Sequence, residues 1–216
     1  MIVAPFFLGS LSLGAKDEGK KVLEIGLGGG SFNMALKKLK PEVNITVVEM
    51  DATVATIAYR WFDVRNSERH KVVVQDGITY LKTATSQGGR YDAIVLDACD
   101  GTNDSPCPAK SFQKAATLNM LRRALTPTGS IVVNILSQDS QDFGYHWQKL
   151  VRLFTTAFPM CMEISLKERG NVYFACVANS KSPKLQKLLT SPERFTSVAS
   201  RLHLSQILNS VTLRKL

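Results

Sequence analysis

The chain has 216 residues, a mass of 23.8 kDa and a formal net charge of +9, with 44% hydrophobic and 21% charged residues. This length suits one domain with its own core, and the composition argues against a disordered chain. No apolar run approaches the roughly 20 residues of a membrane-spanning helix, and residues 151–216 carry ten basic against three acidic residues, so the charge excess lies mainly at the end of the chain.

The first twenty residues predict a leading segment that packs on a sheet, because a signal peptide would carry a basic residue before its apolar stretch. After this segment, apolar strands alternate with amphipathic helices. Strands are expected at 21–26, 44–50, 71–75, 91–96 and 130–136, and helices at 31–39, 52–62, 77–85, 110–125 and 143–158. This alternation is typical of βαβ units around a parallel sheet.

Two further strands are expected at 161–166 and 172–178, joined by a turn of a few residues. A parallel crossover needs a dozen or more residues, so this pair forms an antiparallel hairpin. We therefore predict an α/β fold with a Rossmann-like, seven-stranded, mostly parallel sheet, a C-terminal antiparallel hairpin and helices on both faces. Residues 1–20 would form the leading segment, 21–180 the nucleotide-binding domain, and 181–216 a basic helical extension of it.

The four cysteines lie far apart in the sequence and form no C-x-x-C pair, and the three histidines are isolated. This pattern argues against a structural zinc site, so we expect no metal. The scattered spacing instead predicts reduced thiols in a cytoplasmic protein. The cysteines concerned are Cys99, Cys107, Cys161 and Cys176.

A glycine-rich turn, EIGLGGGS at residues 24–31, connects the first strand to the first helix. Glycines let the backbone turn tightly and approach a ligand, and the following helix N-terminus favours a carboxylate or phosphate. Such turns also bind NAD and FAD.

Glu49 ends the second strand, 23 residues after Gly26, where an acidic side chain accepts hydrogen bonds from ribose hydroxyls. The alternative for Glu49 is a surface carboxylate at a strand end.

Two more aspartates end the third and fourth strands: Asp76, before Gly77, and Asp97. With the glycine turn and Glu49, they resemble the ordered motifs of class I S-adenosylmethionine-dependent methyltransferases over about residues 20–178. The resemblance implies S-adenosylmethionine as cofactor, with its ammonium near Glu24 and its methionine half along Gly26, Gly28 and Gly29. It also implies that Glu49 holds the ribose and that Asp76, Met50 and Gly77 contact the adenine. Asp97 would touch the cofactor as well. Met50 taken alone is more often a core residue.

The segment YDAIVLDACD at residues 91–100 resembles the corresponding segment of spermidine synthases. In that family two aspartates, here Asp97 and Asp100, hold the attacking amine and help to deprotonate it. Two departures stand out. About twenty residues precede the first strand, where spermidine synthases have a β-hairpin domain. Gly29 also replaces the aspartate that grips the amine of decarboxylated S-adenosylmethionine, so the intact cofactor is favoured.

Further motifs resemble the C-terminal domain of the eukaryotic methyltransferase-like proteins that methylate translation elongation factor 1-alpha. These motifs are the GLGGGS loop, Trp61-Phe62, Asp76-Gly77 with Tyr80, and Cys107-Pro108. The resemblance implies a cytoplasmic N-methyltransferase whose substrate is a protein amine, with elongation factor 1-alpha as the suggested partner and a homodimer as the suggested assembly. No membrane association is expected. Trp61 and Phe62 by themselves predict core packing on the sheet.

In this interpretation Asp97, with Asp100 as a second carboxylate, orients a neutral amine for in-line attack on the methyl group. The alternative leaves Asp97 as a strand cap or a cofactor contact. Two other functions stay open: a spermidine-synthase-like aminopropyltransferase, and a methyltransferase fold that binds partners without catalysis. The basic end of the chain keeps nucleic acid open as such a partner, but the favoured interpretation is a solvated face that keeps the protein soluble, so nucleic acid is not the partner we expect.

Overall fold

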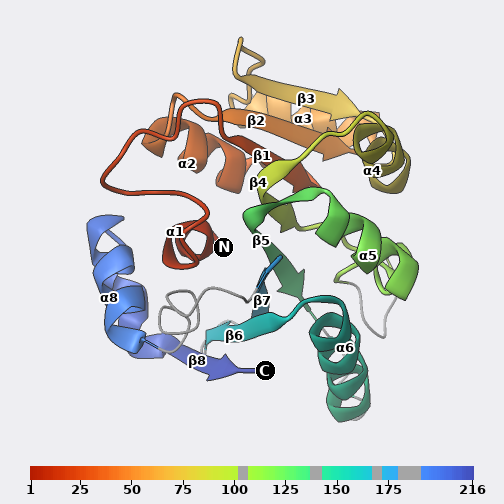
Figure 1. The fold of residues 1–216 in the computed structure, drawn as a ribbon. Coiled ribbons are helices and arrows are strands. Elements are labelled where there is room, and N and C mark those ends of the chain that lie inside the picture. The colour runs from red at the N-terminus through yellow and green to blue at the C-terminus, as the bar shows by residue number, and fades with distance from the viewer. Residues whose placement is uncertain (102–106, 137–142, 167–171, 180–190) are drawn as a thin grey trace.

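A computed structural model describes residues 1–101, 107–136, 143–166, 172–179 and 191–216 of the chain, with one mixed sheet between two layers of helices (Figure 1). Within these residues the sheet has eight strands in the order β3-β2-β1-β4-β5-β7-β6-β8. Neighbours from β3 to β5 run parallel, and those from β5 to β8 antiparallel. The strands are β1 Lys21–Ile25, β2 Asn44–Glu49, β3 His70–Val74, β4 Tyr91–Leu96, β5 Leu125–Ile135, β6 Met160–Leu166, β7 Val172–Val177 and β8 Val211–Lys215.

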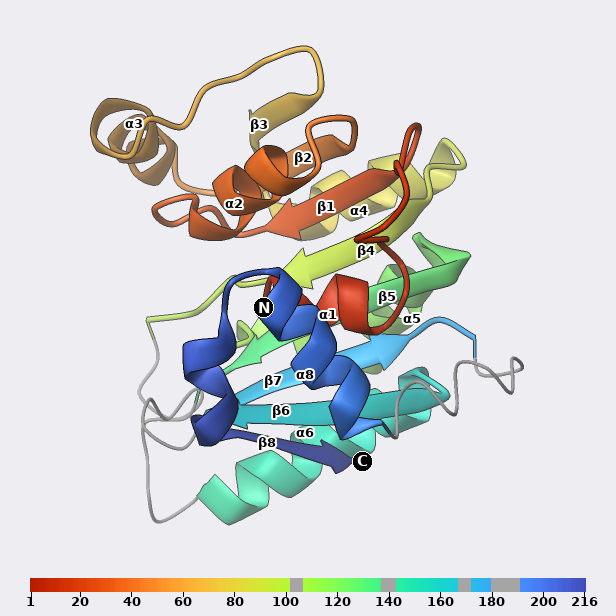
Figure 2. The same ribbon diagram turned by 90° about the vertical axis from the view of Figure 1, so that its left-hand side faces the viewer.

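The helices cover both faces of the sheet, as Figure 2 shows with α1, α2 and α8 in front and α4, α5 and α6 behind. The α-helices are α1 Val3–Phe7, α2 Ser31–Leu39, α3 Ala52–Trp61, α4 Gly77–Ser86, α5 Ala115–Arg123, α6 Phe143–Ala157 and α8 Pro192–Arg201, and the 3-10 helices are η1 Lys110–Phe112 and η2 Ser205–Ser210. The predicted fold class, a Rossmann-like and mostly parallel sheet with a C-terminal antiparallel hairpin, is confirmed.

Two differences from the predicted elements concern the later part of the chain. The segment expected to be wholly helical after residue 181 ends in an eighth strand, β8, which pairs with β6 from Leu166↔Val211 to Met162↔Lys215. The helix expected at 110–125 is divided into η1 and α5, because Lys114 adopts an extended conformation with φ −113° and ψ 135°. The turn expected at 168–171 lies outside the described residues.

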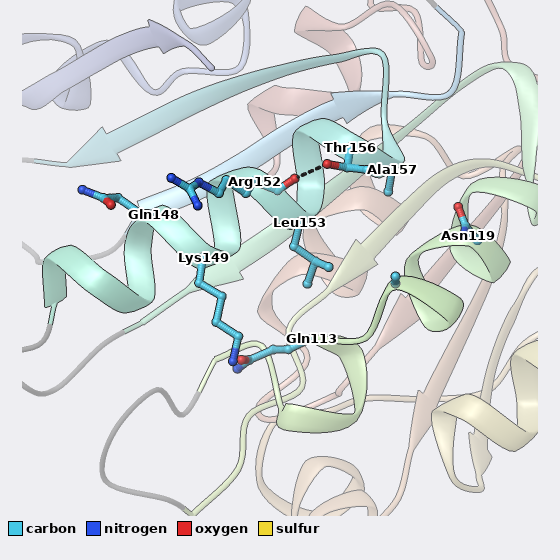
Figure 3. A pocket seen from close by; sticks show the side chains of 9 residues that line it. Gln113, Asn119, Gln148, Lys149, Arg152, Leu153, Thr156 and Ala157 are labelled. Carbon is cyan, nitrogen blue, oxygen red and sulfur yellow. Dashed lines mark hydrogen bonds between the residues drawn. The ribbon is translucent and has the colours of Figure 1, made fainter.

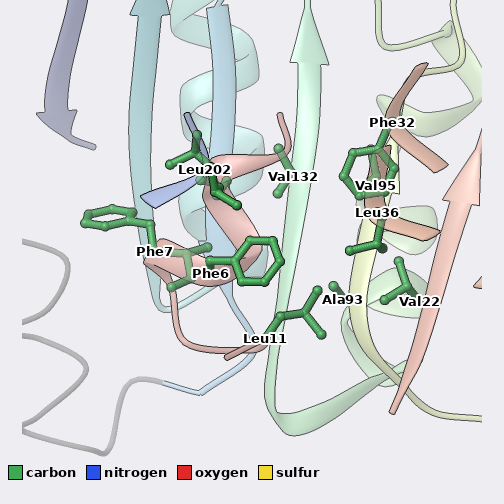
Figure 4. Packing of buried hydrophobic residues seen from close by; sticks show 14 of the residues in the cluster. Phe6, Phe7, Leu11, Val22, Phe32, Leu36, Ala93, Val95, Val132 and Leu202 are labelled. Atoms are coloured by element: carbon green, nitrogen blue, oxygen red, sulfur yellow. The ribbon is translucent and has the colours of Figure 1, made fainter. Parts of the chain in front are cut away.

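Each face of the sheet has its own hydrophobic core. Along β4, Ala93 and Val95 point into the core under α1, α2, α3 and α8, while Ile94 and Leu96 point into the core under α4, α5 and α6. Figure 4 shows the first of these cores. A strand that is buried on both faces contributes alternate side chains to two cores, so its sequence reads as a continuous apolar run.

The leading segment is held against α8 by both polar and aromatic contacts. Arg194 donates from Nε to the Phe7 carbonyl at 2.9 Å and from Nη2 to the Phe6 carbonyl at 3.2 Å. The rings of Phe7 and Phe195 meet edge to face with centroids 5.4 Å apart. Carbonyls in the last turn of a helix lack their usual intrahelical partner, and Arg194 bonds to two of them, although the Phe6 carbonyl also accepts from the Gly9 amide at 3.2 Å.

The prediction of four reduced thiols is wrong, because the fold pairs all four cysteines. Cys161 and Cys176 are direct neighbours across the β6–β7 hairpin, with Cα atoms 4.1 Å apart, and form a disulfide. Cys99 and Cys107 form a second one, with Cα atoms 4.4 Å apart. Strand register and loop closure create these pairings, and neither is visible in the spacing of cysteines along the chain. Within the described residues, no helix is both long and apolar enough to cross a membrane.

Candidate functional site

The candidate site lies where the strand order reverses, at the carboxyl ends of β1 and β4. β1 pairs with β2 on one side and β4 on the other, so the connections after these strands leave in opposite directions and open a crevice between them. The predicted residues of the glycine turn, Glu49, Asp76 and Asp97 all follow or end strands at this edge. The topology therefore gathers groups that are up to 73 residues apart along the chain.

The glycine turn runs close to the end of β4. Gly26 has φ +94°, and a Cβ atom there would lie 2.4 Å from the carbonyl oxygen of Asp97, so a side chain is excluded. Gly30 has φ +74° and its Cβ would lie 2.6 Å from a methyl group of Val64. Gly28 has φ +50° with no atom within 4 Å of its Cβ position. The loop is thus closely packed at Gly26 and Gly30 and open at Gly28, which leaves a backbone surface for a ligand.

Glu49 is buried and fixes the glycine turn to the start of α3. Its Oε2 accepts a hydrogen bond from the Leu27 amide at 2.8 Å, and its Oε1 accepts one from the Asp51 amide at 2.9 Å. Each carboxylate oxygen has a second lone pair, so Glu49 retains acceptor capacity for a ligand hydroxyl. The surface alternative for Glu49 does not hold, since the residue is only 9% exposed.

Glu24 is the most unusual group of the site, because its side chain is buried and one of its oxygens is unpaired. The residue is 2% exposed, and Oε2 makes no hydrogen bond within the part of the chain that the structure describes. Burial raises the pKa of Glu24 well above its usual range, the Asn33 amide opposes this shift, and the charge of Asp97 adds to it. An unsatisfied buried carboxyl is costly for folding, and such groups are common where a cationic ligand binds.

Asp97 lies directly after β4 and is oriented by a residue that the sequence analysis missed. Asn134 on β5 donates from Nδ2 to Asp97 Oδ1 at 2.8 Å, while its own Oδ1 is buried without a partner among the described residues. Burial raises the pKa of Asp97, and the bond from Asn134 opposes that shift. The signal in the sequence is one amide inside the otherwise apolar strand IVVNIL at residues 131–136.

Asp100 follows Asp97 by three residues and lies next to a disulfide-bonded cysteine. Its Oδ2 accepts a short hydrogen bond from the Lys110 amide, and the Ala109 amide donates to the Ala98 carbonyl at 2.8 Å. The Cys99–Cys107 bond joins the same two segments covalently. These contacts fix the segment that carries Asp100 to the start of η1, and its role as a second carboxylate stays a prediction.

Asp76 and Gly77 mark the adenine side of the predicted site. Asp76 is exposed and caps α4, accepting from the Thr79 amide and the Thr79 hydroxyl at 2.8 Å each. Gly77 is buried, and a Cβ there would lie 2.7 Å from Ile25, so α4 begins directly against the end of β1. Their proposed contacts with adenine stay predictions.

The rim of the site carries exposed apolar side chains. Met50 is 73% exposed, so its alternative as a core residue is wrong. The core packing expected for Trp61 and Phe62 is also wrong, because they are 74% and 55% exposed at the end of α3. The Phe62 ring lies over the glycine turn, 3.4 Å from the position that a Cβ on Gly29 would occupy. A Cβ at position 29 would therefore touch this ring at van der Waals distance.

The sheet order, the close-packed glycine turn and the acidic strand ends define a Rossmann-like methyltransferase fold. Sequence comparison then gives the family. The chain belongs to the spermine/spermidine synthase domain family, whose profile matches residues 7–177.

The sequence identities to individual relatives are low or cover only part of the chain. The chain is 27% identical over 215 residues to the eEF1A lysine and N-terminal methyltransferase of Danio rerio, which covers 98% of this chain and 30% of the relative. It is 43% identical over 82 residues to the polyamine aminopropyltransferase of Vibrio vulnificus (strain CMCP6), 38% of this chain and 27% of the relative. Human methyltransferase-like protein 13 in complex with SAH has a TM-score of 0.78 at 24% identity, covering 94% of this chain and 90% of that chain. The chain thus spans less than a third of these two sequence relatives.

Proposed function

We propose that the protein is an S-adenosylmethionine-dependent methyltransferase that methylates an amine of a protein, with elongation factor 1-alpha as the first substrate to test. The observation that carries this proposal is the buried Glu24 carboxyl with its unpaired oxygen beside the glycine turn. Intact S-adenosylmethionine has an α-ammonium group that such a carboxylate would hold. The names of relatives such as the Danio rerio protein support the same activity.

The residues of the site fit the cofactor part by part. Glu24 would hold the ammonium, and the open backbone at Gly28 would accommodate the methionine half with Gly26 and Gly29. Glu49 would accept from the ribose hydroxyls through its remaining lone pairs. The adenine would lie against Met50 and Gly77, with the free Oδ2 of Asp76 facing its amino group. Bound in this way, the cofactor supplies a methyl group that is already activated for transfer.

The chain's own residues then have to position a neutral amine and receive its proton. Asp97 offers Oδ2, because Oδ1 already accepts from Asn134, and the unpaired Oδ1 of Asn134 would accept a second N–H of the same amine. Two acceptors at fixed positions orient the nitrogen lone pair towards the methyl group. Since burial raises the pKa of Asp97, this carboxylate is a better proton acceptor than an exposed aspartate. Asp100 would act as the second carboxylate.

The test compares intact with decarboxylated S-adenosylmethionine by isothermal titration of the whole chain, followed by labelled-methyl transfer to purified elongation factor 1-alpha. Binding of the intact cofactor together with labelling of the factor would support the proposal. Asp97→Asn should bind the cofactor with an affinity within about threefold of the wild type and lose at least about 100-fold in transfer rate, since general-base contributions are of that order. Binding of neither cofactor would contradict the proposal.

The aminopropyltransferase function is the second candidate, and the 43% identity to the Vibrio vulnificus enzyme favours it. That activity uses the decarboxylated cofactor, which lacks the carboxylate but keeps the amine. Preferential binding of the decarboxylated form, with putrescine as acceptor, would establish it instead. Gly29 argues against it, because by the resemblance to spermidine synthases this position would carry the aspartate that grips the amine of the decarboxylated cofactor.

We also propose a cytoplasmic location, where elongation factor 1-alpha would be available, and a homodimer. The two disulfides argue against this location, because disulfides are rare in the cytoplasm. Counting free thiols in protein purified under an alkylating quench tests it. Sedimentation of the purified chain tests the homodimer.

A further inference from the structure

A group of exposed cations lies on the face of the sheet that carries α5 and α6. They are Arg90 before β4, Arg122 and Arg123 at the end of α5, and Lys149 and Arg152 on α6. None of them forms an ion pair with an acidic residue that the structure describes. The described residues from 107 to 166 include one acidic side chain, Glu163, which pairs with Arg214 at 2.7 Å.

Exposed cations without an acidic partner among the described residues occur in the C-terminal part, at Arg201 and Lys215, as well as on α5 and α6. In the C-terminal part, Arg194 is bound to the carbonyls of α1 and Arg214 is paired with Glu163. The cations on α5 and α6 have no comparable counter-charge, although Arg122 also donates to the Ala157 carbonyl at 3.0 Å. A surface with one sign of charge and no partner attracts a polyanion.

The same face is hollowed into a basic groove, which we define as two adjoining hollows that share Asn119. The first hollow, of about 420 Å³, lies between α5 and α6 and is lined by Gln113, Gln148, Lys149 and Arg152 among others (Figure 3). The second, of about 640 Å³, lies at the end of α5 and includes Arg90, Arg122 and Arg123. Among the residues that the structure describes, neither hollow has an acidic or aromatic residue in its lining.

We propose that the basic groove binds the sugar–phosphate backbone of RNA, a function separate from methyl transfer. Guanidinium groups pair with phosphates in a bidentate way. The amides of Asn119 and Gln148 both donate and accept, which suits the 2′-hydroxyl groups that distinguish RNA from DNA, while Gln113 already donates from Nε2 to the Pro108 carbonyl at 2.8 Å. Without aromatic side chains the groove offers no stacking platform, so the binding is independent of base sequence.

The number of cations sets the size of the expected contact. Besides Arg122, the groove is lined by four cations: Arg90, Arg123, Lys149 and Arg152. If each of them neutralises one phosphate, about four phosphate contacts are expected.

The experiment measures fluorescence anisotropy of a labelled single-stranded RNA of about 20 nucleotides with the whole chain between about 50 and 200 mM salt. We expect log K to fall linearly with log salt, with a slope of about −3 for four phosphate contacts on a single strand. The variant carrying Arg90→Gln, Arg123→Gln, Lys149→Gln and Arg152→Gln should bind at least about tenfold more weakly and lose most of this slope. Arg122 is kept because it also bonds to α6.

A matched control removes four exposed cations elsewhere, on β1, α2, α3 and β3: Lys21→Gln, Lys38→Gln, Arg60→Gln and Lys71→Gln. It has the same net charge and should bind RNA within about threefold of the wild type. Equal losses in both variants would show an effect of net charge alone and overturn the proposal. Equal competition by single-stranded DNA or polyglutamate would assign the groove to another polyanion, and no binding at low salt would refute it. The anisotropy contains no cofactor, so its outcome is independent of the proposed methyl transfer.

Discussion

Glu24 combines a high cost of ionisation with a carboxyl oxygen that has no hydrogen-bond partner among the described residues. Burial keeps its carboxyl group protonated to a higher pH than in the unfolded chain. A ligand ammonium favours the ionised form, so binding of the cofactor should release a proton from this residue. The side chain thus links affinity for the cofactor to pH.

This linkage predicts the behaviour of Glu24→Gln. The variant keeps the shape of the side chain but loses a charge-assisted hydrogen bond worth about 1.5–3 kcal/mol, so affinity for S-adenosylmethionine should fall by roughly 10- to 100-fold. Isothermal titration near pH 7 in two buffers of different ionisation enthalpy measures the protons released. The wild type should show buffer-dependent heat and the variant should not. Identical buffer dependence in both proteins would place the proton on another group.

The glycine turn gives a second prediction at this scale, through Gly26→Ala compared with Gly88→Ala. Both glycines have positive φ, at +94° and +74°, but only Gly26 lacks room for a Cβ, whose nearest atom would be 2.4 Å away. Conformational strain alone costs about 1 kcal/mol, or about 2–4 °C in a chain of this size. We expect that loss for Gly88→Ala. Gly26→Ala should lower the melting temperature at least twice as much and abolish cofactor binding. Equal shifts would show that the contact with Asp97 is unimportant.

The positions of residues at the strand ends can be predicted from the sequence, but the side chains that contact them cannot. Glu24, Gly26 and Glu49 follow from strand positions, because a parallel sheet brings every carboxyl end to one edge. The bond from Asn134 to Asp97 depends on the pairing of β4 with β5, which no local pattern encodes. Likewise, the aromatic Phe62 was expected in the core, yet it lies beyond the end of α3 and over the turn at Gly29.

Among the elements, the loop after β4 shows how covalent and hydrogen-bonded contacts cooperate. Cys99 is exposed and Cys107 is buried, and their disulfide spans the loop that begins with Asp97. Cys161 and Cys176 are at most 1% exposed within the β6–β7 hairpin. The two bonds should therefore differ in their access to a reductant, because thiol–disulfide exchange requires direct attack on sulfur.

This difference in burial predicts a stepwise reduction. The folded protein should show no free thiol after purification without reductant. A dithiol reductant under native conditions should release the pair Cys99 and Cys107 first. The pair Cys161 and Cys176 should react only at the rate of unfolding. Alkylation with mass spectrometry over time distinguishes the four positions, and simultaneous labelling of all four would contradict the prediction. Protein alkylated inside cells gives the state in the native compartment.

The edge strand β8 was missed for a different reason. Its sequence VTLRK is only five residues long and lies at the sheet edge, where it pairs with β6. Val211 and Leu213 pack against the core, and Arg214 pairs with Glu163 and lies 5.8 Å from the ring of Trp147. Such edge strands depend on tertiary contacts more than on propensity.

At the scale of the whole molecule, the carboxyl groups with a raised pKa lie apart from those with a lowered pKa. Burial raises the pKa of Glu24 and of Asp97 at the functional edge. On the opposite side, an ionic cluster joins the leading segment to the end of α2. Burial of Asp17 raises its pKa, but hydrogen bonds from Lys20, Ser12 and Lys40 outweigh this effect and leave the pKa lowered. The Asp17 amide and the Lys40 ammonium lower the pKa of Glu42 to about 2.

These shifts predict stability changes of opposite sign across pH. A raised carboxyl pKa destabilises the folded state as pH rises from the unfolded value of about 4.3 through the folded value. Glu24→Gln should therefore unfold at a higher temperature than the wild type at about pH 8, and the gap should close as pH falls below about 4. Asp17→Asn removes a carboxylate with a lowered pKa, so it should be less stable at about pH 7, and this gap should close as pH falls from about 4 towards the folded pKa. Thermal unfolding of the three proteins between about pH 2.5 and 8 measures both gaps. If Glu24→Gln is less stable at about pH 8, then the buried carboxylate has a partner that compensates its burial, and its proposed role as an unsatisfied ligand for an ammonium group is wrong.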